Sequence, residues 1–141
     1  MILLDTNVVS DASHPRPHPS VRKWFSARRK DELFICTPVL AELSYGVERL
    51  PKGTKRSALE EWLIRLETEG FPERVLTFDR RAAREFGKML HLRTGKGRPI
   101  GTMDAIIASI AKAEGATLAT RDVSDFEGLG IEVINPFEFA G

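Results

Sequence analysis

The chain has 141 residues, a length that suits one domain with a substantial apolar core, and we expect a single domain over residues 1–141. Its 21 Lys and Arg residues nearly balance its 20 Asp and Glu residues, which excludes a strongly basic nucleic-acid clamp. No segment has the length and apolarity of a membrane span or the pattern of a signal peptide, so we expect a cytoplasmic protein. The single cysteine, Cys36, excludes an internal disulfide and lies in an apolar run, which favours a core position over a nucleophile.

Short apolar runs alternate with amphipathic stretches along the whole chain. The runs predicted as buried strands are Ile2–Leu4, Leu33–Cys36, Arg74–Phe78, Ala116–Thr120 and Ile131–Ile134. This alternation is typical of βαβ units, whose crossovers are right-handed. We therefore predict a three-layer α/β/α fold with a central parallel five-stranded sheet in the order 3-2-1-4-5.

Helix starts are predicted from residues that cap a first turn. The predicted caps are Ser20, Thr37 (followed by Pro38), Asp79 and Thr102. Apolar positions at helical spacing then predict which faces meet the core. These stripes are Val21, Trp24 and Phe25; Leu40, Leu43, Val47 and Leu50; Leu59, Trp62, Leu63 and Leu66; Ala83, Phe86, Met89 and Leu90; and Ile106, Ile107 and Ile110.

Charge is unevenly distributed although the total is balanced. Ala12–Lys30 holds six Arg or Lys and no acid, and Asp79–Arg98 holds seven against two acids. From Pro99 to the end, two basic residues face seven acids. A basic rim around an acidic pocket would suit a polyanion held at a metal site, whereas solvated helix faces explain any single Arg equally well.

Four acids occupy positions where chemistry is expected. Asp5 and Asp122 follow the first and fourth predicted strands, which are neighbours in the predicted order. Ligands of parallel α/β sheets bind beyond the carboxyl ends of the strands. Glu42 and Asp104 lie early in predicted helices among apolar or small neighbours. Converging carboxylates repel one another, and hard oxygen ligands select Mg²⁺ or Mn²⁺, so the sequence predicts a site for one of these ions that activates water.

Each acid also has a simpler interpretation. Asp5 would serve as a helix cap, Asp104 as a charge that stabilises a helix N-terminus, and Glu42 as a solvated residue. Asp122 would be a turn residue, and Asp125 competes for its role, although Asp125 is more typical of a cap or turn acid.

Four segments together resemble a PIN-domain ribonuclease of the VapC toxin type, in its FitB-like branch. They are Ile2-Leu3-Leu4-Asp5-Thr6-Asn7-Val8, Leu40-Ala41-Glu42-Leu43 with Gly46, Asp104-Ala105-Ile106-Ile107-Ala108, and Ala119-Thr120-Arg121-Asp122 with Phe126. They follow the order of the family at similar spacing, and the resemblance spans essentially the whole chain.

The resemblance implies a Mg²⁺-dependent endoribonuclease that acts as the toxin of a toxin–antitoxin pair. Asp5 and Asp104 would be the principal metal ligands, and Glu42 and Asp122 would complete the acidic pocket. The fourth acidic position is variable in the family, so the choice between Asp122 and Asp125 stays open.

The resemblance also assigns supporting residues and partners. Thr120 matches a frequent hydroxyl of the family, with a plain strand residue as its alternative, and Asn7 matches an amide that supports the ligands. The family implies a homodimer, a small antitoxin encoded beside the toxin, and DNA binding through their joint complex. Lys55–Glu69 would be a dimer or antitoxin surface, although burial in the chain's own core explains Trp62 as well.

Rival functions fit the sequence less well. A receiver domain needs paired acids after its first strand and a Lys after its fifth, whereas here Asp5 stands alone and Pro136 follows the fifth strand and its Asn135. A haloacid-dehalogenase-like phosphatase needs Asp-x-Asp, but Asn7 stands where the second Asp belongs. A metal-binding regulatory or nucleic-acid-binding module with a degenerate site remains the alternative to the nuclease.

Overall fold

The computed structural model describes residues 1–141, and its five strands form one parallel sheet in the order β3-β2-β1-β4-β5. The strands are β1 (Ile2–Leu4), β2 (Leu33–Cys36), β3 (Val75–Leu76), β4 (Thr117–Ala119) and β5 (Val133–Ile134). The predicted strand order is therefore confirmed. The register pairs Leu4 with Ala119, so β1 and β4 end side by side.

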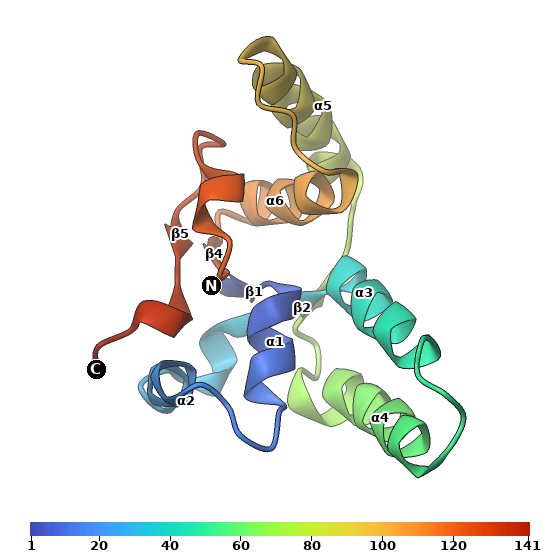
Figure 1. Ribbon diagram of the computed structural model, residues 1–141. Coiled ribbons are helices and arrows are strands. Elements are labelled where there is room, and N and C mark those ends of the chain that lie inside the picture. The colour runs from blue at the N-terminus through green and yellow to red at the C-terminus, as the bar shows by residue number, and fades with distance from the viewer.

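Six α-helices cover the two faces of this sheet. They are α1 (Thr6–Ala12), α2 (Pro19–Ser26), α3 (Thr37–Glu48), α4 (Thr54–Arg65), α5 (Arg80–Gly95) and α6 (Thr102–Glu114). Right-handed crossovers place α1 to α4 on one face and α5 and α6 on the other. Figure 1 shows these two groups on opposite sides of β1, with α5 extending away from the body of the molecule.

The core lies on both faces of the central strands. Leu3, Leu4 and Leu118 are fully buried, and Trp24 of α2 is among the largest buried side chains. Cys36 is fully buried as well, and burial raises the pKa of its thiol to about 12. The predicted core position of Cys36 is thus confirmed, because a thiol in that state is not a nucleophile near neutral pH.

Three strands are shorter than predicted. β4 lacks one residue at each end of the predicted Ala116–Thr120, and two further strands lose half or more of their predicted length. β3 covers only Val75–Leu76 of the predicted Arg74–Phe78, and β5 covers only Val133–Ile134 of the predicted Ile131–Ile134. Both lie at the edges of the sheet, where a strand has a neighbour on one side only. Apolar residues continue beyond the paired segment, and for this reason the sequence overstates the length.

Three of the four predicted helix caps are wrong in position. The observed N-caps are His18, Cys36 and Gly101, in place of Ser20, Thr37 and Thr102. In α2 and α3 a proline occupies the first or second helical position, and its fixed φ lets the helix begin earlier. The fourth cap, Asp79, is confirmed, since its side chain accepts a hydrogen bond from the Ala82 amide.

The predicted buried stripe of α5 is confirmed at Met89, with Phe86 and Leu90 half-buried, and is wrong only at Ala83. Ala82, Met89 and Arg93 are buried, whereas Ala83 is exposed. Arg93 is buried at a position that a pattern of apolar residues does not mark, because its apolar stem packs inward while its head is hydrogen-bonded.

Helix α4 has no fully buried residue, and it is followed by a π-helical turn at Leu66–Gly70. Trp62 is half-buried and packs against the core, which supports the interpretation of this side chain as part of the chain's own packing. No helix of the protein has the length and apolarity needed to cross a membrane.

Candidate active site at the carboxyl edge of the sheet

The site is built around Asp5, which follows β1 directly and is only 5% exposed. Its backbone amide donates to the carbonyl of Ala119 (2.9 Å), which continues the pairing of β1 with β4. The Asp5 carboxylate caps α1 by accepting from the Thr6 amide (2.8 Å). Its other oxygen accepts from the hydroxyl of Thr120 (2.7 Å), a fully buried residue at the end of β4. The helix-cap interpretation of Asp5 is therefore correct. Asp5 also lies at the centre of a group of acids whose other members are Glu42, Asp104, Asp122 and Asp125.

Asn7 connects Asp5 to Asp122. The side-chain amide of Asn7 donates to Oδ2 of Asp122 (3.1 Å) and, more weakly, to Oδ2 of Asp5 (3.5 Å). The backbone amide of Asp122 in turn donates to the Thr120 hydroxyl oxygen (3.1 Å). Residues more than a hundred positions apart in the sequence thus form one hydrogen-bonded group. Asn7 and Thr120 were both expected to support the metal ligands, and both contact Asp5 and Asp122 directly.

Glu42 reaches the same group from α3. Its carboxylate accepts a short hydrogen bond (2.6 Å) from the hydroxyl of Thr6, the residue that follows Asp5. Thr6 therefore orients Glu42 toward Asp5. No role for Thr6 was predicted from the sequence. Its position directly after Asp5, at the end of a strand, was the feature that could have indicated one.

Asp104 approaches from the first turn of α6 and is half-buried. Its pKa is raised to about 6, mainly by burial and in addition by the nearby negative charges of Asp5, Asp125, Glu42 and Asp122. Burial is also the main cause that raises the pKa of Asp5, with Glu42 and Asp122 adding to it, while hydrogen bonds from Thr120 and Thr6 oppose the shift. The acids on four different segments therefore share one electrostatic environment.

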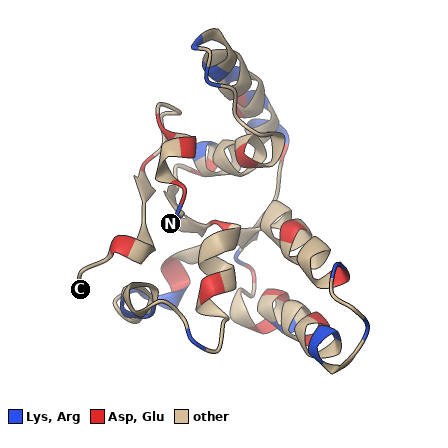
Figure 2. Ribbon diagram, in the orientation of Figure 1, with Lys and Arg blue, Asp and Glu red and all other residues tan.

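This acidic group has no cationic partner within the chain. None of the five acids, which are Asp5, Glu42, Asp104, Asp122 and Asp125, forms an ion pair with Lys or Arg. Figure 2 shows acidic positions on α3, on α6 and at the end of β1, while basic positions gather along α5. No three His, Cys, Asp or Glu side chains of the protein lie close enough together to hold one metal ion between them. The donor set nevertheless fits a hard divalent cation, because it consists of carboxylate oxygens whose charges are unbalanced.

Asp122 and Asp125 occupy different parts of the site. Asp122 is bonded through Asn7 and Thr120 to the Asp5 group. The side chain of Asp125 makes no such bond, and its charge acts mainly on Asp104. The geometry thus separates two acids that the sequence left as competitors.

Arg93 is a buried residue that the sequence analysis did not single out. It is 5% exposed, and its guanidinium donates to the carbonyls of Arg98 (2.8 Å), Asp125 (2.8 Å) and Glu127 (3.3 Å). It therefore ties the loop before α6 to the turn that carries Asp125. In the sequence it is one of seven similar basic residues between positions 79 and 98, and nothing in the pattern distinguishes it.

A parallel five-stranded sheet in this order, with helices on both faces, is the architecture of a PIN-like α/β fold, and the family model named PIN domain matches residues 2–130. The chain belongs to the PIN-domain family. It is 39% identical to plasmid stability protein StbB of Pseudomonas syringae pv. tomato, over 98% of this chain and 99% of that protein. It is 38% identical to VapC ribonuclease Y4jK of Sinorhizobium fredii, again over 98% and 99% of the two chains.

Solved structures agree with these relatives. The structure of FitAB bound to the IR36 DNA fragment matches with a TM-score of 0.92 and 31% identity, covering 100% of this chain and 99% of that one. PIN-domain nucleases of the VapC type are generally dependent on a divalent metal. The family resemblance expected from the sequence is confirmed.

Proposed function

We propose that this protein is an endoribonuclease and the toxin of a toxin–antitoxin pair. The observation that carries the proposal is the group of acids around buried Asp5, which lacks any cationic partner in the chain. The names of its relatives, a VapC ribonuclease and a toxin bound with its antitoxin to DNA, support the same activity.

The metal is proposed to be Mg²⁺, with Mn²⁺ as a substitute, because the donors are carboxylates and no thiolate or imidazole accompanies them. Asp5 and Asp104 would be its principal ligands, and Glu42 and Asp122 would complete the pocket. When bound, the ion supplies the Lewis acid that activates water and stabilises the leaving oxygen of the phosphodiester.

The chain's own residues then have distinct tasks. Glu42, oriented by the Thr6 hydroxyl, would accept a proton from the attacking water. Thr120 and Asn7 fix the direction of the Asp5 carboxylate and join Asp122 to it, which is what outer partners of metal ligands do. The basic residues of Ala12–Lys30 and Asp79–Arg98 that lie toward the carboxyl edge would hold the RNA backbone, whereas Arg29, paired with Asp31 at the amino edge, would not contact it.

The proposed partners follow from the same relatives. A small antitoxin would bind the protein, and DNA would be bound only through the joint complex. The homodimer is proposed from the family resemblance alone. Cytoplasmic action follows from an RNA substrate and an antitoxin that are both made there.

The test is cleavage of a total cellular RNA pool by purified, antitoxin-free protein with Mg²⁺ or with EDTA. We expect cleavage that requires the metal and is lost in Asp104→Asn, while the matched change Asp31→Asn at an exposed position leaves it intact. Failure of well-folded, Mg²⁺-saturated wild type to cleave would favour a binding or regulatory module instead.

A further inference from the structure

Arg121 stands in the middle of the acidic site yet pairs with none of its acids. It lies between Thr120 and Asp122, the two residues that complete the Asp5 group. Its guanidinium forms no ion pair and no hydrogen bond in the chain, although it is exposed and has carboxylates nearby. A cation beside unbalanced carboxylates would be expected to pair with them, so something holds it elsewhere.

The ring of Phe137 holds it. The Arg121 guanidinium lies 4.3 Å from the centroid of this ring, in a cation–π arrangement. Phe137 is itself fixed: it is only 9% exposed, and its amide donates to the side chain of Asn135 (3.0 Å). The edge of His18 at the start of α2 contacts the same ring (5.6 Å between centroids). The backbone of Arg121 is fixed as well, since its amide donates to Oδ1 of Asn7 (3.1 Å).

Stacking has a consequence that an ion pair would not have. It restrains the guanidinium by its flat face and leaves all of its N–H donors free to bind an anion. It also keeps the positive charge out of the carboxylate group, where Arg121 would compete with a metal ion for the same oxygens.

The surroundings of Arg121 indicate which anion it meets. His18 joins the Phe137 ring to the basic segment Ala12–Lys30, in which Arg16 and Arg22 are exposed and unpaired. A chain of phosphates that passes from the acidic site toward α2 would meet Arg121 first.

We propose that Arg121 binds a backbone phosphate of the RNA next to the cleaved bond, and that Phe137 positions it for this contact. The proposal rests on the proposed nuclease function, since RNA is the polyanion that this function brings to the site. Arg121 would be a binding residue, and Phe137 a positioning residue that acts through it.

The first measurement is RNA binding in the Asp104→Asn background, which prevents cleavage. The probe is a fluorescein-labelled, mixed-sequence single-stranded RNA of about 12 nucleotides, followed by anisotropy at several salt concentrations. Arg121→Gln should weaken binding about tenfold, as expected for loss of a charged hydrogen bond. It should also make the slope of log K against log salt less negative by about 0.7, the contribution of one phosphate contact in single-stranded RNA.

The matched control is Arg29→Gln. The side chain of Arg29 is 78% exposed and pairs with Asp31 at the opposite edge of the sheet, so its loss removes the same charge far from the site. Its affinity and salt slope should equal those of the background protein. An Arg121→Gln slope equal to that of Arg29→Gln would overturn the proposal, whatever the cleavage assay gives.

A second variant separates the role of the ring from that of the charge. Phe137→Leu keeps an apolar side chain in the core and removes the stacking face, and it should weaken RNA binding about threefold. In protein that already carries Arg121→Gln, the same change should have no further effect. Equal weakening with and without Arg121 would show that Phe137 does not act through it.

Kinetics with Asp104 intact keep the two proposals distinguishable. In Arg121→Gln, KM should rise about tenfold with kcat unchanged, because a phosphate that does not react binds equally in the substrate and the transition state. Wild type that cleaves RNA while Arg121→Gln keeps its KM and salt slope would leave the nuclease in place and remove this inference. Wild type that neither cleaves nor binds the probe would remove both.

Discussion

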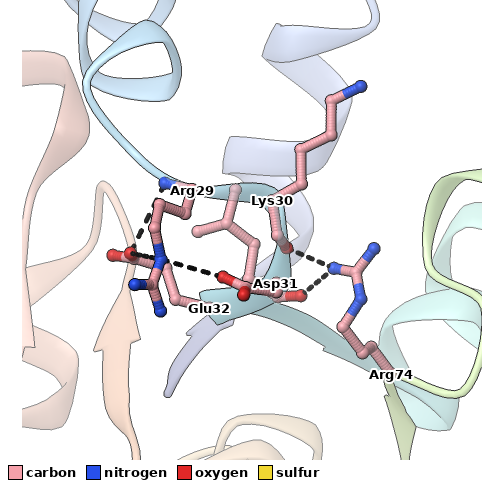
Figure 3. A network of polar contacts seen from close by, with 6 residues as sticks. Arg29, Lys30, Asp31, Glu32 and Arg74 are labelled. Atoms are coloured by element: carbon pink, nitrogen blue, oxygen red, sulfur yellow. Dashed lines mark hydrogen bonds and ion pairs between the residues drawn. The ribbon is translucent and has the colours of Figure 1, made fainter.

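The two ends of the strands, called here the amino edge and the carboxyl edge of the sheet, differ in how their charged side chains are paired. At the amino edge, Arg29 pairs with Asp31 (3.1 Å), and Arg74 donates to the carbonyls of Lys30, Leu33 and Gly70. Figure 3 shows this network, in which acids and arginines lie within bonding distance of one another. At the carboxyl edge, Asp5 is more deeply buried than any of these acids and has only neutral partners.

This difference in pairing indicates a structural role for the amino edge and a functional role for the carboxyl edge. Exposed ion pairs and bonded carbonyls stabilise a structure modestly and leave nothing unbalanced. Buried carboxylates without a cation cost stability, as the raised pKa values of Asp5 and Asp104 indicate. An external cation would complete such an arrangement, and this supports the proposal that the carboxyl edge is the functional one.

The largest expected effect comes from neutralising the centre of the acidic group. Asp5→Asn should reduce RNA cleavage at least about a thousandfold, the loss of a metal ligand worth about 4 kcal/mol of transition-state stabilisation. The same change should raise the Tm of metal-free protein, because an amide is not repelled by Glu42 and Asp122. Circular dichroism melts in EDTA and cleavage rates in Mg²⁺ measure the two effects. A variant that loses activity only because it unfolds would have a lower Tm, which would contradict the proposed role.

The next effect compares one arginine from each edge. Arg93→Met removes a buried side chain and leaves three partly buried carbonyls without its donors, so it should lower the free energy of unfolding by about 3 kcal/mol. Arg74→Met should cost only about 1 kcal/mol, because Arg74 is half-buried and water can replace it. Urea unfolding measures both changes.

Cleavage kinetics sharpen this comparison. At a temperature where both variants are folded, Arg93→Met should cleave RNA about tenfold more slowly, since it releases the loop that leads into α6 and Asp104. Arg74→Met should cleave as wild type does. Equal activity in the two variants would show that Arg93 serves stability alone.

A smaller effect decides between the two acids after β4. Asp122→Asn should reduce cleavage about 10-fold to 100-fold, because Asp122 is bonded to the Asp5 group through Asn7. Asp125→Asn should reduce it by less than about threefold, because its charge acts on Asp104 only at a distance. The ratio of kcat/KM values for the two variants is the measurement. A larger loss in Asp125→Asn would reverse the assignment.

The sequence was a good guide where a residue's role depends on its place along a strand. The strand order and the meeting of Asp5 with Asp122 followed from apolar runs and the right-handed crossover rule, because those features are local and the topology is nearly unique. The positions of the Asp5, Glu42 and Asp104 segments followed in the same way.

The sequence was a poor guide where a role depends on contacts between segments. Arg93 and Arg121 look alike in the sequence, yet one is buried against carbonyls and the other is stacked on a ring from a distant turn. Helix caps shifted by a residue or two because proline and backbone geometry, not side-chain type alone, decide where a helix begins.

The smallest expected effect is a dependence of stability on pH. The pKa of Asp104 is raised from 3.8 to about 6, and that of Asp5 is also raised. A carboxyl group with a raised pKa binds its proton more tightly in the folded state, so the free energy of unfolding falls as pH rises through this window. Metal-free protein should therefore lose a few degrees of Tm between pH 4 and pH 6. Asp79, whose pKa is lowered, acts in the opposite sense but only below 3.8.

Bound metal should reverse this trend. The ion binds the ionised carboxylates, so saturating Mg²⁺ stabilises the folded state more as pH rises, and the Tm in Mg²⁺ should rise or stay level over the same window. Asp104→Asn in EDTA is the control, and its smaller fall in Tm isolates the share of Asp104. The carboxyl edge then differs from the amino edge in one measurable respect: its stability is set by proton and metal together. Identical pH profiles with Mg²⁺ and with EDTA would mean that the acids around Asp5 do not bind this ion.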